Sequence, residues 1–595
     1  MEVAHDVATD KTAATNVCPQ DNSRVGDQAL NSPPQRHAVS PRTLLAIGAM
    51  AFAYATNLGA FLLIAPIITV INKDLGPVSY YTWLASAWSI TGGPGLVVAG
   101  TLSDLIGRRW FIIGSGIVSG VSGIVGATAH SVPQGKSLSR PSFGQAGALT
   151  SFASIGELVP NKWRGYVLGV VNLSAGVFVL CGSLFGNEMA ASTGPGWRSA
   201  FYFTLATQFA AAFVCLLTYF PATPLATRNI TKKQIIREFD YLGLLGIFLG
   251  PVLLLLGITW IPEYGANSAK FIAPFVTGTI LMIALGFWEA RGASNPLLHP
   301  FLFSRVRTFT MLLVVAFVGG MLFYALQSFW PPFLAAVFDG TDARQIGIDG
   351  IPFGAGTQVG GVGSALLLPI LGPKVGTHSM LTFGVALQLL FIPLMYLVTP
   401  FRKDIALCFT FFGGVGIGVA ELLTILLVQL STPDEWIGFA TGALGLARML
   451  GGTAGTAIYT SIYQDKVTKI VPSRVAAVVL PMGLPESSLP QLLGVLLGTT
   501  PDMPISKVEG ITPDMIGPAV LASREGQVAS FRYVWLASIA FGVVSLICAA
   551  ITKDLSPRLT MDVAQHLKGD IIPDAEKNSV SMEHIEHGSQ AVAGS

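Results

Sequence analysis

The stretch GTLSDLIGRR, residues 100–109, decides how the sequence is interpreted, because it is a short charged connection between two apolar runs. The run before it covers about 83–101, and the run after it covers about 110–129. Each run is long enough to cross about 30 Å of hydrocarbon as a helix. The stretch therefore predicts a tight polar turn between two membrane-spanning helices.

Five residues of this connection have a physical role at such a turn. Gly100 permits close approach of a neighbouring helix, and Gly107 allows a tight turn. Asp104 lies near a helix end, where it can pair with Arg108 or Arg109 or meet the N-terminus of another helix. Such a charged clamp would latch one conformation of the protein. The alternative is a plain basic loop that only anchors the topology.

The composition of the whole chain agrees with a membrane protein. The chain has 595 residues, of which 51% are hydrophobic and 11% charged, and its mean hydropathy is +0.61. Soluble domains carry about 25% charged residues. Apolar runs of spanning length recur along the sequence without the alternation of transmembrane β-strands. The fold class predicted is an all-α polytopic membrane protein.

The apolar runs predict about fourteen spans if a short run at 143–160 is counted. The predicted spans are 44–70, 83–101, 110–129, 143–160, 166–187, 199–220, 241–261, 271–289, 309–330, 350–371, 379–399, 405–430, 438–462 and 533–552.

These spans divide the chain into five parts. The predicted parts are a disordered cytoplasmic tail (1–42), a six-helix bundle (43–220), a cytoplasmic linker with two extra helices (221–300), a second six-helix bundle (301–552), and a disordered cytoplasmic tail (553–595). Within the second bundle, residues 463–532 are predicted to be a long outer loop, because their apolar pieces are short and interrupted by proline.

The membrane side predicted for each later loop depends on whether the short fourth span crosses the bilayer. If the N-terminus is cytoplasmic and 143–160 crosses, Lys and Arg are more frequent in cytoplasmic loops than in outer ones, as the positive-inside rule requires. Without that crossing the basic stretch TKKQIIRE (231–238) would face outward. The stretch SVPQGKSLSRPSF (131–143) is then an outer loop. Either a divergent helix or an error in the gene model explains its unusual composition.

In its position between two spans, the pattern G-x-L-S-D-x-x-G-R-R resembles the signature of the major facilitator superfamily. The resemblance implies two six-helix bundles that move by alternating access, with the two extra helices between them. Fourteen helices are similar to the fungal drug and toxin efflux branch. Further stretches resemble trichothecene-efflux-type transporters, and related siderophore transporters share the layout. These stretches are GELVPNKWRG (156–165), GPGWRSAFYF (194–203), ARMLGGTAGTAIY (447–459), and GLPESSLPQLL (483–493) before FRYVWLASIAFGVVS (531–545).

Two features depart from antiporters of that superfamily. The G-P-x-x-G-G ending of the fifth helix is replaced by LCGSLF (180–185), and the first helix contains Tyr54 and Asn57 where drug antiporters often have an Asp. These departures weaken the prediction of proton antiport but not that of the fold.

Ionisable residues inside spans are candidates for function. Glu421 and Arg448 are predicted to lie at similar depth on antiparallel neighbours, as an ion pair that is either structural or coupled to transport. Arg140 resembles the fourth-helix arginine that the family uses for proton transfer, and the alternative is a loop arginine. Glu157, Glu188 and Glu289 lie near predicted helix ends, from which they can reach the headgroups.

Uncharged polar residues inside the spans can line a cavity or form interhelical hydrogen bonds, of which the second role is commoner. These candidates are Tyr54, Asn57, Asn172, Gln208, Gln327, Gln358, Gln388 and Gln429. The sequence has no G-x-x-x-x-G-K-[ST] loop for nucleotide phosphates. No catalytic residues, metal site or cofactor are expected, and the chain is not predicted to be an enzyme.

The sequence therefore predicts a plasma-membrane secondary transporter that exports small, largely apolar organic molecules with the proton gradient. Its expected partners are a small-molecule substrate, protons and the bilayer; no nucleic acid is expected, and the protein is expected to be a monomer. Proton-coupled siderophore uptake is an alternative in the same fold. A transport-inactive sensor is an alternative of another class.

Overall fold

The computed structural model describes residues 40–75, 83–130, 142–221, 239–293, 296–298, 300–340, 342–497 and 503–560. Regular structure in these ranges is almost entirely helical. A helix pairs its backbone groups internally, which the interior of a bilayer requires. Eleven helices in the described ranges are long and apolar enough to cross a membrane. The multi-pass helical fold class is thus confirmed.

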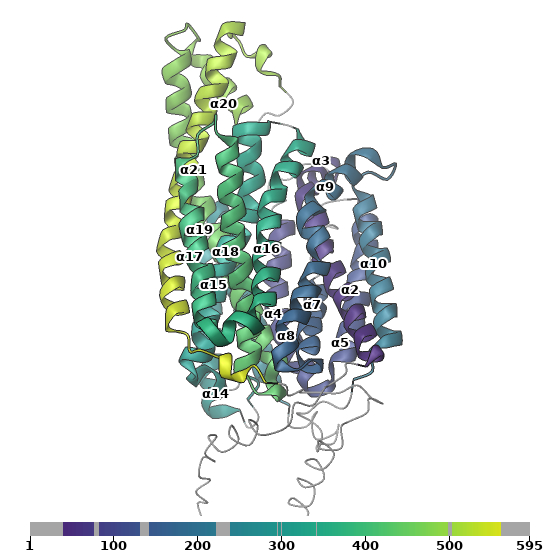
Figure 1. Ribbon diagram of the computed structural model, residues 1–595. Helices are drawn as coiled ribbons and strands as arrows, with labels where there is room; N and C mark the ends of the chain where they lie inside the picture. Colours follow the sequence, from purple (N-terminus) through teal and green to yellow (C-terminus); the bar gives the residue numbers. More distant parts are fainter. Residues whose placement is uncertain are drawn as a thin grey trace, which may run out of the picture. The chain divides into compact units, whose positions relative to one another are not determined.

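The first half of the protein, residues 40–221, contains eight helices in the part that the structure describes (Figure 1). Helix α5 packs against α10 and α7, and α4 packs against α7. Helices α8 and α9 together form one candidate span, Asn161–Ser192. The helices are α2 (Pro41–Ile64), α3 (Ile68–Leu75), α4 (Trp83–Ile106), α5 (Arg108–Ala127), α7 (Ser142–Leu158), α8 (Asn161–Ser174), α9 (Gly176–Ser192) and α10 (Arg198–Thr218).

The second half, from residue 300, is preceded by the two extra helices, α12 (Tyr241–Tyr264) and α13 (Ala269–Phe287). Helix α12 contacts α13, α4 and α19, so it touches one helix of each half. The second-half helices are α14 (Pro300–Ser304), α15 (Met311–Leu334), α16 (Ala343–Val375), α17 (Thr377–Leu394), α18 (Lys403–Ser431), α19 (Ile437–Val479), α20 (Leu489–Leu496) and α21 (Pro513–Ile551).

Helices occupy all fourteen predicted positions, but three of them fall outside the eleven candidate spans. Helix α7, at the doubtful position 143–160, has 17 residues and packs against α4 and α5. Helices α4 and α19 are long enough, but glycine, serine and threonine lower their apolar content. Packing against other helices explains why these sequences need less apolar surface than a lipid-facing helix.

The prediction of a loop over 463–532 is wrong. Helix α19 has 43 residues and continues to Val479, and α21 has 39 residues and begins at Pro513. Pro472 lies inside α19 and Pro518 lies inside α21 without ending either helix. Of the two short apolar pieces, one extends α19 and the other forms the short helix α20. Valines of α19 pack with residues of α20 and α21 in a small core of their own, which includes Val471, Val475, Leu492, Met515 and Ala519. In Figure 1 this extension lies beyond the ends of the neighbouring helices.

The predicted start of disorder at 553 is also wrong, because residues 553–560 are described and include a short helix, Ser556–Arg558. Their backbone and side chains make hydrogen bonds to α8, α16 and α18. Most of the two predicted tails (residues 1–39 of 1–42 and 561–595 of 553–595) lies outside the described residues, as do the linker segment 222–238 and the stretch 131–141.

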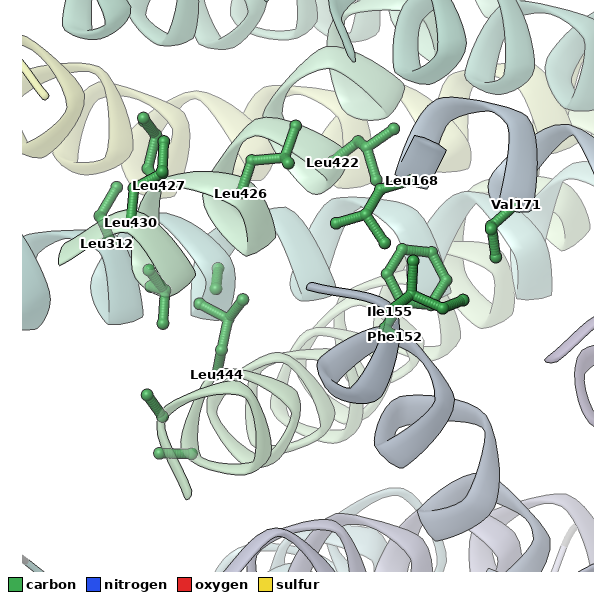
Figure 2. Packing of buried hydrophobic residues seen from close by; sticks show 14 of the residues in the cluster. Phe152, Ile155, Leu168, Val171, Leu312, Leu422, Leu426, Leu427, Leu430 and Leu444 are labelled. Atoms are coloured by element: carbon green, nitrogen blue, oxygen red, sulfur yellow. The ribbon is translucent and has the colours of Figure 1, made fainter. Parts of the chain in front are cut away.

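The apolar core differs between the two ends of the helices. At the end where α4 passes into α5, called the latch end below, a single cluster contains residues of both halves. Figure 2 shows Phe152 and Ile155 of α7 and Leu168 of α8 beside Leu422 and Leu426 of α18. At the opposite end, the described residues form separate clusters in the second half and in the first. The halves therefore share their large apolar core at the latch end, and a smaller cluster of Leu96 with Met449 also joins them further along the helices.

Candidate functional site

The latch begins at Gly107, where the chain turns from α4 into α5. Gly107 has a φ of 109°, a conformation that side chains other than glycine rarely adopt. The tight turn places Arg108 in the first position of α5, and its Nη2 donates a hydrogen bond of 2.9 Å to Oδ1 of Asp104. A Cβ atom on Gly100 would overlap the carbonyl oxygen of Gly438. Gly100 thus serves the close approach, and Gly107 the tight turn, that the sequence predicted.

Asp104 joins the two halves of the protein. Its carboxylate accepts hydrogen bonds from the backbone N–H groups of Gly438, at 3.2 Å, and Phe439, at 2.8 Å. Both donors belong to the first turn of α19, where unpaired N–H groups and the helix dipole favour a negative charge. The two interactions predicted for Asp104, with Arg108 and with a helix N-terminus, are present together.

Arg109 does not belong to this clamp. Its Nη2 donates to the carbonyl of Leu216 at 2.9 Å, and its guanidinium carbon lies 3.9 Å from the centre of the Phe220 ring. It therefore ties α5 to the end of α10, inside the first half.

Glu157 of α7 completes the clamp, and the sequence analysis missed it. The structure buries Glu157, at 6% exposure, and pairs it with Arg108, which is 4% exposed. Two carboxylates therefore share one guanidinium in a buried site. The only sign of its role in the sequence was its position in GELVPNKWRG. A glutamate at a helix end has the same sequence pattern whether it faces lipid headgroups or a buried arginine. Glu289 is likewise buried instead of reaching the headgroups.

Arg164 adds a second buried cation to this end. It is 1% exposed, and within the described ranges its Nε and Nη2 atoms have no hydrogen-bond partner. The charges of Asp434 and Glu157 lie close enough to interact with it. A buried guanidinium is tolerated when opposite charges surround it, so separating the halves at this point would change its environment.

The central site is the ion pair of Glu421 on α18 with Arg448 on α19. Glu421 lies ten residues before Ser431, and Arg448 lies eleven residues after Ile437, so both are about 15 Å along their helices from the latch end. The side chains keep 27% and 20% of their surface exposed, respectively. The structure thus brings the predicted pair together at the predicted depth, and leaves it open to water.

Aromatic residues from both halves surround this pair. The guanidinium carbon of Arg448 lies 5.0 Å from the Phe323 ring and 5.9 Å from the Tyr324 ring, distances typical of cation–π contacts. Tyr54 of α2 donates a hydrogen bond of 3.4 Å to Oδ1 of Asn172 on α8. Electrostatic interaction also couples Tyr54 to the ion pair. Five helices from the two halves therefore meet at one polar centre.

The other predicted cavity residues lie elsewhere. Gln208 donates to Asn57 at 3.3 Å, which links α10 to α2 inside the first half. Gln388 is fully buried on α17, and neither amide atom has a hydrogen-bond partner within the described ranges. Gln358 lies beside Gly176, at the contact of α16 with α9. Gln327 is half-buried on α15, and Arg140 lies outside the described residues.

Gln429 belongs to the latch end instead of the centre. It is 1% exposed on α18, and its amide packs against Gly156 of α7, in the other half. Among the residues with described positions, no group of three His, Cys, Asp or Glu side chains could hold a metal ion.

Known proteins match almost the whole chain. A model of the family described as "Fungal trichothecene efflux pump" matches residues 7–588. The MFS-type transporter prx5 of Penicillium rubens is 25% identical over 534 residues, which is 88% of this chain and 93% of that protein. The trichothecene efflux pump TRI12 of Fusarium sporotrichioides is 24% identical over 543 residues, which is 90% of each chain.

The fold has a solved relative as well. The crystal structure of the human organic anion transporter MFSD10 matches with a TM-score of 0.52 at 13% identity, over 84% of this chain and 100% of that one. At this identity the likeness concerns the fold alone. The chain belongs to the fungal trichothecene efflux pump family, whose members are efflux transporters of the major facilitator fold.

Proposed function

We propose that the protein is a proton-driven exporter of small, largely apolar organic compounds in the plasma membrane, with the latch end and both termini in the cytoplasm. The family supports efflux, and relatives are named for trichothecenes, which makes this class the first substrate to test. The excess of Lys and Arg in the loops that the sequence assigns to the cytoplasm supports the orientation.

The observation that carries proton coupling is the half-buried ion pair at the contact of the halves. Glu421 and Arg448 are held by second-half helices, while Tyr54 and Asn172 of the first half approach them. A proton on Glu421 would remove its charge and leave Arg448 without a counter-charge. The pair can then exist in two charge states with different preferences for the first half. This coupling role is preferred over a structural one because a purely structural pair has no need of access to water.

The shared core and the latch support a conformation closed at the latch end. Asp104 bonds the first turn of α19, and the apolar cluster there contains residues of both halves. At the opposite end, the described parts of the halves have clusters of their own. With the latch end in the cytoplasm, closure at this end is required of an exporter that releases its substrate outside, and the remaining contact of α9 with α16, near Leu184 and Gly347, would still have to part.

The test is transport into inside-out membrane vesicles that contain the protein. An imposed gradient, acidic inside, should drive accumulation of a radiolabelled trichothecene, and Glu421→Gln should abolish the response to the gradient. The matched control is Asp465→Asn, which neutralises an exposed carboxylate on α19 and should leave accumulation unchanged. Accumulation that ignores the gradient in the unaltered protein would contradict proton coupling.

Deletion of the gene in intact cells distinguishes export from uptake. Deletion of the gene should raise the accumulation of an added trichothecene and leave the uptake of radio-iron siderophores unchanged. Loss of siderophore uptake on deletion would overturn export in favour of import. No change in either would favour a transport-inactive sensor.

A further inference from the structure

Residues 553–560 follow α21 and run across the latch end from one half of the protein to the other. We propose that this segment, called the strap below, holds the latch end closed, and that its far end at Thr560 must detach before that end can open. The proposal rests on alternating access as part of the proposed function. Figure 1 shows the strap in yellow at the end of the helices where α14 lies.

The strap is anchored on α17 in the second half. Oδ1 of Asp554 accepts hydrogen bonds from the backbone N–H of Thr377, at 2.8 Å, and from its hydroxyl, at 2.9 Å. Thr377 begins α17, so Asp554 caps the N-terminus of that helix from outside it. The Leu555 N–H donates back to the Thr377 hydroxyl at 2.9 Å.

Two further contacts fix the strap to the second half. The Ser556 hydroxyl donates to the carbonyl of Gly372, in the last turn of α16, at 2.7 Å. Arg558 donates to the carbonyl of Leu430, in the last turn of α18, at 3.0 Å. A cation is favourable there because the C-terminal carbonyls of a helix carry partial negative charge. The anchor therefore joins the ends of three second-half helices.

The far end of the strap reaches the first half. The backbone N–H of Lys162 donates to the carbonyl of Thr560 at 2.8 Å, and Nδ2 of Asn161 donates to the Thr560 hydroxyl at 3.3 Å. Asn161 and Lys162 are the first two residues of α8. The N–H groups of a first helical turn have no partner within their own helix, so the strap satisfies one of them.

The strap and the latch hold different contacts at the same end. Asp104 ties α4 to α19, whereas the strap ties α8 to α17 and α18, next to the contact of α8 with α16. Opening the latch end separates both contacts, so releasing Asp104 alone is not sufficient. The strap has fewer bonds to the first half than to its anchor. On opening, the Thr560 end is therefore the end that detaches.

The first test measures opening directly, without transport. In a chain whose five cysteines are replaced, Gln429→Cys places a single thiol, 1% exposed in the parent, at the latch-end contact between α18 and α7. One variant ends after Ser556 and loses the bonds of Arg558 and Thr560. The matched control ends after Thr560, so that both lack 561–595 and only the control keeps the far end.

The chain that ends after Ser556 should react with a hydrophilic maleimide roughly tenfold faster than the control, because it lacks the two hydrogen bonds to α8 and the Arg558 bond that helps to anchor the strap to α18. Equal rates would overturn the proposal. Thermal unfolding of both variants shows whether the faster reaction reflects opening: a rate difference that accompanies a lowered unfolding temperature counts against the strap, since global loosening would then explain it.

The second test locks the strap. Lys162→Cys with Thr560→Cys should form a disulfide, since the hydrogen-bonded backbones are within the span that a disulfide bridges. The control pair is Arg307→Cys with Lys553→Cys, which are backbone-bonded within the second half. The first disulfide should reduce trichothecene transport at least about tenfold, and reduction of the disulfide should restore transport. The control disulfide should not change transport.

Undiminished transport by the fully oxidised first pair would overturn the strap. If the reduced protein carries no trichothecene at all, the proposed substrate fails while the maleimide rates still decide whether the strap holds the latch end closed.

Discussion

At the scale of single residues, the central pair poses the question whether Glu421 and Arg448 serve folding or coupling. Both roles require the pair to form, which the structure shows, but they differ in what happens when both charges are removed together. Removing one partner leaves an unpaired charge, whereas an uncharged replacement of similar size is often tolerated by the fold.

We expect Glu421→Gln with Arg448→Met to fold, with an unfolding temperature at or above that of the parent, because no unpaired charge remains. We expect the same double variant to lose the dependence of transport on the proton gradient. Thermal unfolding in detergent and vesicle transport at two gradients provide the measurements. A double variant that folds and still responds to the gradient would assign the pair to structure alone.

Asp554 provides a second prediction at this scale. Burial opposes its ionisation, but hydrogen bonds from Ser556 and Thr377 outweigh burial and lower the pKa of Asp554 to about 2. Because this pKa is lower in the folded than in the unfolded chain, its contribution to stability is present above about pH 4 and is lost as the pH falls towards 2.

Asp554→Asn should therefore lower the unfolding temperature by the same amount at pH 5, 6 and 8, roughly 1–3 °C for a few weakened hydrogen bonds. Asp404→Asn is the control, because Asp404 is an exposed residue in the first turn of α18 and makes weaker contacts. A deficit that grows steadily from pH 5 to pH 8 would contradict the assigned pKa.

At the scale of helices, the sequence predicted where helices occur better than how far each helix extends. The alternation of apolar runs with charged turns placed a helix at each of the fourteen positions, because a bilayer admits few other structures. It did not predict that α19 and α21 continue beyond their spans, since the valines of α19 become part of a core only when the two helices pack together. Burial of Glu157 was hidden for the same reason: its partner Arg108 comes from another helix. The ion pair of Asp104 with Arg108 could be predicted because the two residues are only four positions apart in the sequence.

The extension of α19 and α21 should behave as a small folding unit. Val471 is fully buried in its core, so Val471→Asp places an unpaired charge there and should destabilise the extension by at least about 3 kcal/mol. Limited proteolysis should then cut between residues 463 and 532 while the remaining helices stay intact. Lys469→Asp adds the same carboxylate to an exposed position two residues earlier and should not change the cleavage. Equal resistance of both variants would show that the extension does not depend on this core.

At the scale of the whole molecule, the two halves approach each other through glycines at the latch end. Gly100 of α4 and Gly438 of α19 are in backbone contact, which any side chain at position 100 would prevent. The approach matters because Asp104 can reach the first turn of α19 only at this separation. Helix packing and electrostatics are therefore not independent here: a methyl group that moves α4 outward also weakens the carboxylate contact four residues later.

Gly100→Ala should consequently favour the state that is open at the latch end. The methyl group meets backbone, which cannot rotate away as a side chain would, so overpacking of about 1–3 kcal/mol falls on the closed state alone. That penalty predicts a maleimide reaction of Gln429→Cys roughly 5- to 150-fold faster, together with slower trichothecene transport. Gly114→Ala is the matched control, since a Cβ there meets nothing within 4 Å and helix propensity alone would rise slightly. Unchanged reaction rates in Gly100→Ala would mean that the latch end does not close through this contact during transport.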